Sequence, residues 1–97
     1  MRREGAPLLA AQVTIVNEKG IHTRTATELV KLAQTFHSAI RISLDRITAD
    51  AKSVIELLTL GAGKGQVVSV EAEGPDEAEA LEKIVRFIRN GFAGANE

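Results

Sequence analysis

Apolar and polar residues alternate with a period of two in four short segments of the chain, which predicts four β-strands. In the first segment, Val13 and Ile15 are apolar and the intervening Gln12 and Thr14 are polar. The strands are expected at residues 11–17, 40–44, 47–50 and 68–72. Because successive side chains point to opposite faces of a strand, each strand offers one face to a hydrophobic core.

Three other segments show the residue spacing of amphipathic helices. The first is expected at residues 23–36. The second is shorter: it opens at Ser53, which has the capping-box spacing with Glu56, and it ends near Leu60. The last is expected to begin with Pro75 in its first position and to stop at Gly91. The order βαββαβα predicts an α+β fold with three helices on one face of a four-stranded antiparallel sheet.

Length and composition fit one small domain with an aliphatic core. The chain has 97 residues, of which 44% are hydrophobic but only 3% are aromatic. We expect a flexible N-terminal extension at residues 1–10, a folded domain at residues 11–92 and a tail at residues 93–97. The absence of cysteine excludes disulfides and thiolate chemistry.

Charge and hydropathy narrow the range of partners. A net charge of −1 gives no electrostatic drive toward nucleic acid and fits a monomer that binds its partners transiently. No apolar run reaches membrane-spanning length, and the first ten residues are too short for a signal peptide, so we expect a cytoplasmic protein with no membrane partner. The two histidines and the dispersed carboxylates lack metal-ligand spacing, so neither a metal nor a cofactor is expected.

The segment from Gly20 to Ala26 places a nucleophile at the predicted start of a helix. His22 stands where the helix begins, and Arg24 follows two residues later. A helix N-terminus presents unpaired N–H groups and a positive dipole end, which suit a phosphate group. Imidazole is a nucleophile that is largely neutral near physiological pH. An arginine at the helix end that disfavours cations is explained by an anion, so the segment predicts a histidine that carries a phosphoryl group.

Three motifs carry a resemblance to a known family. They are Gly-Ile-His-Thr-Arg at 20–24, Ala-Lys-Ser-Val-Ile at 51–55 and Gly-Pro-Asp-Glu-Ala at 74–78. In this order and spacing, residues 11–92 resemble the histidine-containing phosphocarrier protein (HPr) family of the bacterial phosphoenolpyruvate-dependent phosphotransferase system. The resemblance implies an open-faced β-sandwich, which agrees with the order of elements.

The resemblance also implies a function and its partners. His22 would take a phosphoryl group from phosphorylated enzyme I, on its Nδ1 atom, and pass it to the A components of enzyme II during sugar uptake. Arg24 would stabilise the phosphoryl oxygens. The protein would then be a covalent intermediate between its partners and not itself an enzyme.

Position 25 departs from the family pattern, which commonly has proline three residues after the histidine. Thr25 restores a backbone N–H and adds a hydroxyl group. We expect this hydroxyl to contact either the phosphoryl group or His22. The departure is expected to change the rate of transfer or the stability of the phosphohistidine, without loss of function.

Ser53 has two interpretations. The capping-box spacing predicts that its side chain caps the second helix and that Glu56 returns the bond. The resemblance instead implies a regulatory site, because some family members are phosphorylated at the matching serine by a dedicated ATP-dependent kinase. A phosphate on Ser53 would meet the Glu56 carboxylate three residues later, so capping is favoured.

The second helix is too short to bury all of its apolar residues, because Leu57 and Leu60 already supply its core face. An exposed apolar cluster beside a phosphoryl site indicates a docking surface. The apolar residues expected in this surface are Val54, Ile55 and Leu58. The resemblance implies contacts of this surface with enzyme I and other partners, and it adds three residues of the first helix at the edge, namely Thr23, Thr27 and Lys31.

Two other functions stay open at this point. One is a nitrogen-type regulatory homologue, whose phosphorylation state controls protein partners and not sugar uptake. The other is a small ligand-binding α+β domain without phosphoryl chemistry, which only Thr25 favours. The glycine-rich segment 61–65 lacks the full P-loop pattern and joins a helix to a strand, so it is interpreted as a structural turn.

Overall fold

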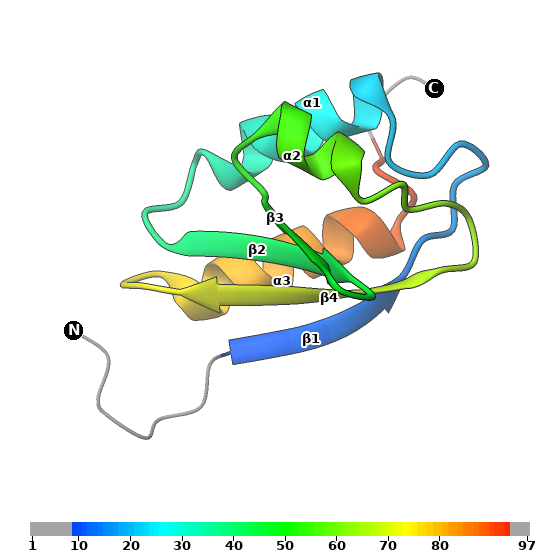
Figure 1. Cartoon of the computed structure of the whole chain (residues 1–97). Helices are drawn as coiled ribbons and strands as arrows, with labels where there is room; N and C mark the ends of the chain where they lie inside the picture. The colour runs from blue at the N-terminus through cyan, green and yellow to red at the C-terminus, as the bar shows by residue number, and fades with distance from the viewer. Residues whose placement is uncertain (1–8, 94–97) are drawn as a thin grey trace.

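The computed structural model describes residues 9–93, which form four strands and three helices (Figure 1). In chain order the elements are β1 (Leu9–Thr14), α1 (Thr23–Ala33), β2 (Ala39–Leu44), β3 (Ile47–Asp50), α2 (Val54–Thr59), β4 (Val67–Glu73) and α3 (Glu77–Arg89). This order confirms the predicted βαββαβα arrangement and the α+β fold class.

The four strands form one antiparallel sheet in the order β1-β4-β2-β3. Helix α3 packs mainly on β1 and β4, and α1 packs against both α2 and α3. In Figure 1, α3 lies behind β2 and β4, while α1 and α2 run along the top of the molecule. The helices therefore cover one face of the sheet, which confirms the predicted open-faced β-sandwich.

Side-chain alternation explains why the other face of the sheet stays open. Ile42 lies in register between Val70 of β4 and Ala49 of β3, and all three side chains are completely buried on the helix side. The next residues along these strands point the opposite way. There Ser43 lies beside Thr48, and their hydroxyl oxygens are 3.0 Å apart in a hydrogen bond on the exposed face.

Strand β1 begins and ends earlier than the alternation predicts. Leu9 and Ala10 pair with β4, so they belong to the sheet and not to the expected N-terminal extension. Although Ile15 is buried, the strand ends at Thr14 because the N–H of Ile15 donates to the carbonyl of Gln66 in the loop before β4 (2.9 Å). The rest of the expected extension and most of the expected tail, residues 1–8 and 94–97, lie outside the described residues.

Helix α1 ends at Ala33, three residues before the predicted end. The next residues form tighter turns, because Thr35 and Phe36 donate to carbonyls three residues back instead of four. Phe36 is nevertheless buried in the core. The apolar periodicity thus continues past the end of the helix, which is why it overestimates the length of α1.

The predicted start of α3 at Pro75 is wrong. The helix begins at Glu77, and Asp76 is its N-cap residue. The Asp76 carboxylate does not cap its own helix but accepts hydrogen bonds from the backbone N–H groups of His37 and Ser38, each 2.9 Å long, and from the Ser38 hydroxyl. It therefore joins the loop before α3 to the loop between α1 and β2.

This link between the two loops depends on Gly74 and on the charge of Asp76. A Cβ atom on Gly74 would lie 2.6 Å from the Ser38 Cα atom, so the close approach requires glycine. Hydrogen bonds from the Ser38 hydroxyl and the His37 N–H stabilise the charged carboxylate and lower the pKa of Asp76 to about 2. The third family-like motif of the sequence thus has a structural role at the end of α1 away from His22.

Candidate functional site

His22 is the N-cap residue of α1 and has an extended backbone, with φ −131° and ψ −176°. The preceding residues form a tight turn in which the Asn17 side-chain amide donates to the Gly20 carbonyl (2.9 Å). Gly20 has a φ of +64°, and a Cβ atom there would lie 2.3 Å from the Ala62 carbonyl oxygen. Only glycine fits this contact, so the position of His22 depends on the packing of this turn against the loop after α2.

The loop after α2 bonds to the segment that leads into His22. The carbonyl of Ala62 accepts a hydrogen bond from the N–H of Ile21, next to His22 (2.9 Å). The N–H of Gly63 donates to the side-chain oxygen of Gln66 (2.7 Å). These bonds agree with the interpretation of segment 61–65 as a structural turn and not as a phosphate-binding loop.

Thr25 fixes the backbone around the histidine. Its side chain is completely buried, and its hydroxyl oxygen accepts a hydrogen bond from the His22 N–H (3.0 Å). The hydroxyl also lies within donating distance of two carbonyls, that of Gly20 (2.9 Å) and that of His22 itself (3.3 Å). His22 and Thr25 together form a reciprocal capping box at the first turn of α1. Of the two expected contacts of this hydroxyl, the structure contains the one with His22, and burial keeps the hydroxyl away from a phosphoryl group in solvent.

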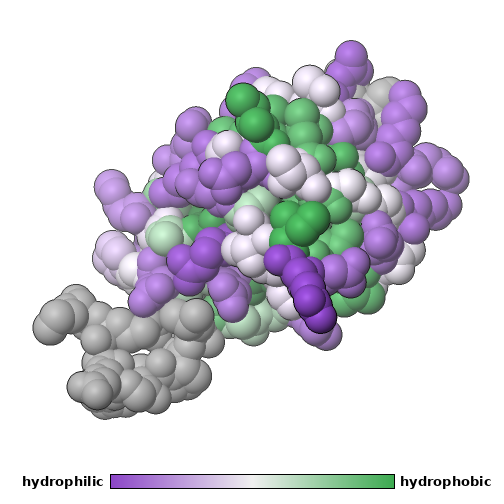
Figure 2. Space-filling view, in the orientation of Figure 1, coloured by the Kyte–Doolittle hydropathy of each residue, from purple (hydrophilic) through white to green (hydrophobic). Residues whose placement is uncertain are grey.

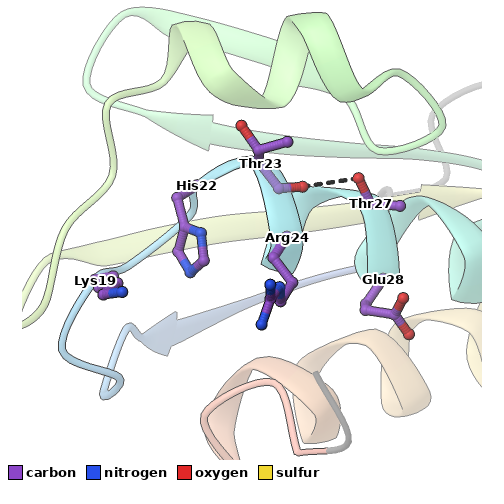
Figure 3. A pocket seen from close by; sticks show the side chains of 6 residues that line it. All are labelled: Lys19, His22, Thr23, Arg24, Thr27 and Glu28. Carbon is purple, nitrogen blue, oxygen red and sulfur yellow. Dashed lines mark hydrogen bonds between the residues drawn. The ribbon is translucent and has the colours of Figure 1, made fainter. Parts of the chain in front are cut away.

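The imidazole of His22 is half-buried and lines a surface pocket at the start of α1. The residues around the pocket are Lys19, His22, Thr23, Arg24, Thr27 and Glu28. In Figure 3 the ring hangs below the first turn of the helix, with Lys19 on one side and Arg24 on the other. The pocket thus brings together the two residues that the sequence singles out for phosphoryl chemistry, His22 and Arg24.

Lys19 is a pocket residue that the sequence pattern does not single out. It belongs to no periodic segment, and its side chain is exposed. The turn that ends at Gly20 places it beside the imidazole, and this turn is defined by contacts with the distant loop after α2. The only local feature of the sequence that could identify Lys19 as a pocket residue is its place as a cation three residues before the histidine.

Helix α2 exposes part of the expected docking surface. Leu57 and Leu60 are buried in the core, whereas 78% of Ile55 and 40% of Leu58 are exposed. Val54 is half-buried and packs against the core. Figure 2 shows an apolar area over α2 at the top of the molecule. Helix α1 packs beside α2. Of the three α1 residues expected at the edge of this surface, Thr23 and Lys31 are exposed and Thr27 is half-buried.

Ser53 caps α2, as one of its two interpretations predicts. Its hydroxyl oxygen accepts a hydrogen bond from the backbone N–H of Glu56 (3.2 Å). The predicted return bond from Glu56 to Ser53 is wrong, because the Glu56 carboxylate accepts from the N–H of Asp50 instead (2.9 Å). The N–H of Ser53 is already used by the Asp50 carbonyl (3.0 Å). The carboxylate still lies at the same helix end, where it would repel a phosphate on Ser53.

Residues 9–93 lack two further kinds of feature. This part of the chain has no helix that is long and apolar enough to cross a membrane. It also contains no group of three or more histidine, aspartate or glutamate side chains that could hold a metal ion.

The fold and the site together define a class of protein. An open-faced β-sandwich with a half-buried histidine that caps a helix and shares a surface pocket with an arginine is the arrangement of a histidine phosphocarrier domain. Residues 9–90 match the family PTS-HPr, described as the PTS HPr component phosphorylation site. The chain belongs to this HPr family.

Named relatives agree with this assignment. The chain is 46% identical over 77 residues to the phosphocarrier protein HPr of Vibrio cholerae, covering 79% of this chain and 91% of the relative. It is 42% identical over 81 residues to the phosphocarrier protein NPr of Escherichia coli, covering 82% and 90% of the two chains. A crystal structure of HPr from Thermoanaerobacter tengcongensis superposes with a TM-score of 0.84 at 34% identity, covering 91% of this chain and 99% of the other.

Proposed function

We propose that His22 accepts a phosphoryl group from phosphorylated enzyme I and passes it to the A components of enzyme II in sugar uptake. The observation that carries this proposal is the half-buried imidazole at the N-terminus of α1, in a surface pocket shared with Arg24. Membership of the HPr family supports it. The chain then acts as a monomeric carrier in the cytoplasm, a covalent intermediate between enzymes.

The chemistry needs a nucleophilic nitrogen and a site that binds the phosphoryl group only moderately. The imidazole lone pair forms the new N–P bond while the bond between phosphorus and the donor breaks, and its electron pair leaves with the donor. The reverse exchange delivers the group to the acceptor. The positive end of the α1 dipole and the Arg24 guanidinium stabilise the phosphoryl oxygens without enclosing them, so the group can leave again.

Thr25 positions the nucleophile in this proposal. Its hydroxyl holds the backbone N–H of His22 and lies against the Gly20 carbonyl, so the imidazole projects from one defined backbone conformation. Defined positioning favours transfer because the nitrogen is held where it can attack in line with the departing donor. Thr25 therefore acts through His22 and not on the phosphoryl group.

The exposed face of α2 is the proposed docking surface for enzyme I and the enzyme II components. Ile55 and Leu58 provide its apolar centre, and α1 continues it toward the pocket. A transient carrier requires such a surface beside its reactive group, because each partner must bring its own reactive group to the same imidazole. Small apolar anchors with a polar edge suit short-lived complexes.

The direct test is intact-mass measurement after incubation with enzyme I and phosphoenolpyruvate. We expect the wild-type chain to gain the mass of one phosphoryl group, in an acid-labile form. His22→Ala removes the proposed acceptor, and His37→Ala, which alters the other histidine of the chain, is the matched control. The proposal requires His37→Ala to be modified like wild type and His22→Ala to remain unmodified. Equal modification of both variants would overturn it.

A nitrogen-type regulatory role is the second candidate, supported by the similarity to the NPr protein. The two roles differ in the acceptor and not in the chemistry at His22. Phosphorylated protein offered equal amounts of a sugar-type and a nitrogen-type acceptor should transfer its phosphoryl group faster to the acceptor of its own system. Faster loss to the nitrogen-type acceptor would favour the regulatory role.

A further inference from the structure

Within residues 9–93, the two cations that line the pocket around His22 form no ion pair with an acidic side chain. Lys19 and Arg24 stand on the two sides of the imidazole (Figure 3). Two carboxylates are close enough in the chain to neutralise them, those of Glu18 and Glu28, and the structure pairs both with other residues. This arrangement leaves the charge of Lys19 facing the pocket.

Glu18 is next to Lys19 in sequence but binds a cation from another loop. The Lys64 ammonium lies 2.9 Å from the Glu18 carboxylate. This hydrogen bond and the charge of Lys64 lower the pKa of Glu18, which favours the ionised form of its carboxylate. Lys64 belongs to the glycine-rich turn after α2, which gives that turn a second role in holding Glu18.

Glu28 lines the same pocket as Arg24 and is also engaged elsewhere. Its carboxylate pairs with Lys31 one turn further along α1, at 3.1 Å. Within residues 9–93, neither Lys19 nor Arg24 takes part in an ion pair. Two cations and the positive end of a helix dipole thus converge on one imidazole, and an anion bound there gains from all three.

We propose that Lys19 is a second cationic contact for the phosphoryl group carried by His22, opposite Arg24 across the ring. This inference rests on the proposed function of His22. Lys19 contacts the oxygens of the transferred group and neither attacks phosphorus nor exchanges a proton. A flexible, exposed lysine suits a carrier because it stabilises the group in solvent by a modest amount and swings aside when a partner docks.

The test uses phosphoramidate, a small phosphoryl donor that reacts with histidine and needs no docking surface. The variant is Lys19→Gln, and the matched control is Lys83→Gln, which removes one positive charge from α3 outside the pocket. The readout is ³¹P NMR of the phosphorylated chain as a function of pH. Loss of a nearby cation should raise the pKa of the phosphoryl group by roughly 0.2–0.7 unit in Lys19→Gln. Lys83→Gln should titrate like wild type.

Salt and stability measurements separate a direct contact from a structural effect. The difference between Lys19→Gln and wild type should shrink at about 0.5 M salt, because an exposed charge contact is screened. The thermal midpoint should be the same for both proteins. A titration of Lys19→Gln that coincides with wild type would overturn the inference and leave the role of His22 intact. Failure of phosphoramidate to modify wild-type His22 would overturn both.

Discussion

Replacing Thr25 with valine isolates the hydroxyl group that ties the first turn of α1 to the turn before it. Valine keeps the volume and the branched Cβ of threonine at a completely buried position. It removes the hydrogen bond from the His22 N–H (3.0 Å) and the contact with the Gly20 carbonyl (2.9 Å). The Gly20 carbonyl keeps its bond from the Asn17 side chain, so only the His22 N–H loses its partner.

The magnitude follows from that one unpaired group. A buried donor left without a partner costs about 1–3 kcal/mol, and loss of a helix-capping bond costs about 0.5–2 kcal/mol. These two figures describe the same bond and are not added. Because the bond from the His22 N–H is only partly buried, we expect Thr25→Val to lower the free energy of unfolding by about 1–2 kcal/mol. For a domain of this size, the thermal midpoint should fall by roughly 5–15 °C.

The matched control is Thr27→Val on the same helix. The Thr27 hydroxyl donates to the carbonyl of Thr23 (2.7 Å), but both groups lie at the solvent-exposed side of α1. Its loss should change the unfolding free energy by no more than about 0.5 kcal/mol. Urea denaturation of the two variants compares them directly, and Thr25→Ser should recover most of the loss. Equal destabilisation by Thr25→Val and Thr27→Val would refute the assigned role of the buried hydroxyl.

Three further predictions concern the link that Asp76 makes between two loops, the docking surface and the turn before His22. Because the pKa of Asp76 is about 2 in the fold and 3.8 ordinarily, its stabilising effect is complete above 3.8 and is lost as the pH falls through 2. Asp76→Asn should therefore flatten the decline of the unfolding free energy between pH 4 and pH 2, measured by urea denaturation. A decline as steep as in wild type would contradict the stabilising role of the Asp76 carboxylate. Ile55→Glu should lower the kcat/KM for phosphorylation by enzyme I by about five- to tenfold, with an unchanged thermal midpoint and unchanged reaction with phosphoramidate. An equal loss of phosphorylation rate with enzyme I and with phosphoramidate would mean that Ile55→Glu disturbs the His22 pocket and not the docking of enzyme I. Gly20→Ala should destabilise the fold by about 2–4 kcal/mol, because its Cβ meets the Ala62 carbonyl, whereas Gly65→Ala, with open space around it, should cost about 1–2 kcal/mol. Similar values for the two glycines in thermal unfolding would exclude the steric explanation.

Local periodicity predicts the sheet and the helices well, because alternation and helical spacing are imposed by the core. Ile42 and Val70 are buried where the alternation places them. The errors of the sequence-based prediction lie at the ends of helices and strands, where hydrogen bonds to distant residues determine the last residue of the element. Ile15 continues the alternation of β1, but its N–H bonds to Gln66 outside the sheet. Pro75 fits a helix start, yet the helix begins after Asp76, whose carboxylate is held by the distant Ser38.

The candidate site shows the same division between local and long-range information. His22 and Arg24 can be predicted as site residues from the sequence, because a nucleophile and a cation at a predicted helix start are local features. Lys19 cannot be predicted as a pocket residue from the sequence, because its position depends on the contact between Gly20 and Ala62, which are far apart in the chain. Glu56 illustrates the limit of a local rule. The spacing predicts a bond to Ser53, but β3 ends nearby and offers the N–H of Asp50 instead.

The most direct test of the carrier function follows the phosphoryl group through one complete cycle. The chain is phosphorylated with enzyme I and phosphoenolpyruvate, freed of the donor and mixed with an enzyme IIA component, and both proteins are weighed over time by mass spectrometry. A carrier should lose its phosphoryl group as the acceptor gains it in equal amount, and His22→Ala should neither gain nor pass the group. A phosphoryl group that stays on the wild-type chain with every acceptor, or that still reaches an acceptor through His22→Ala, would contradict the account.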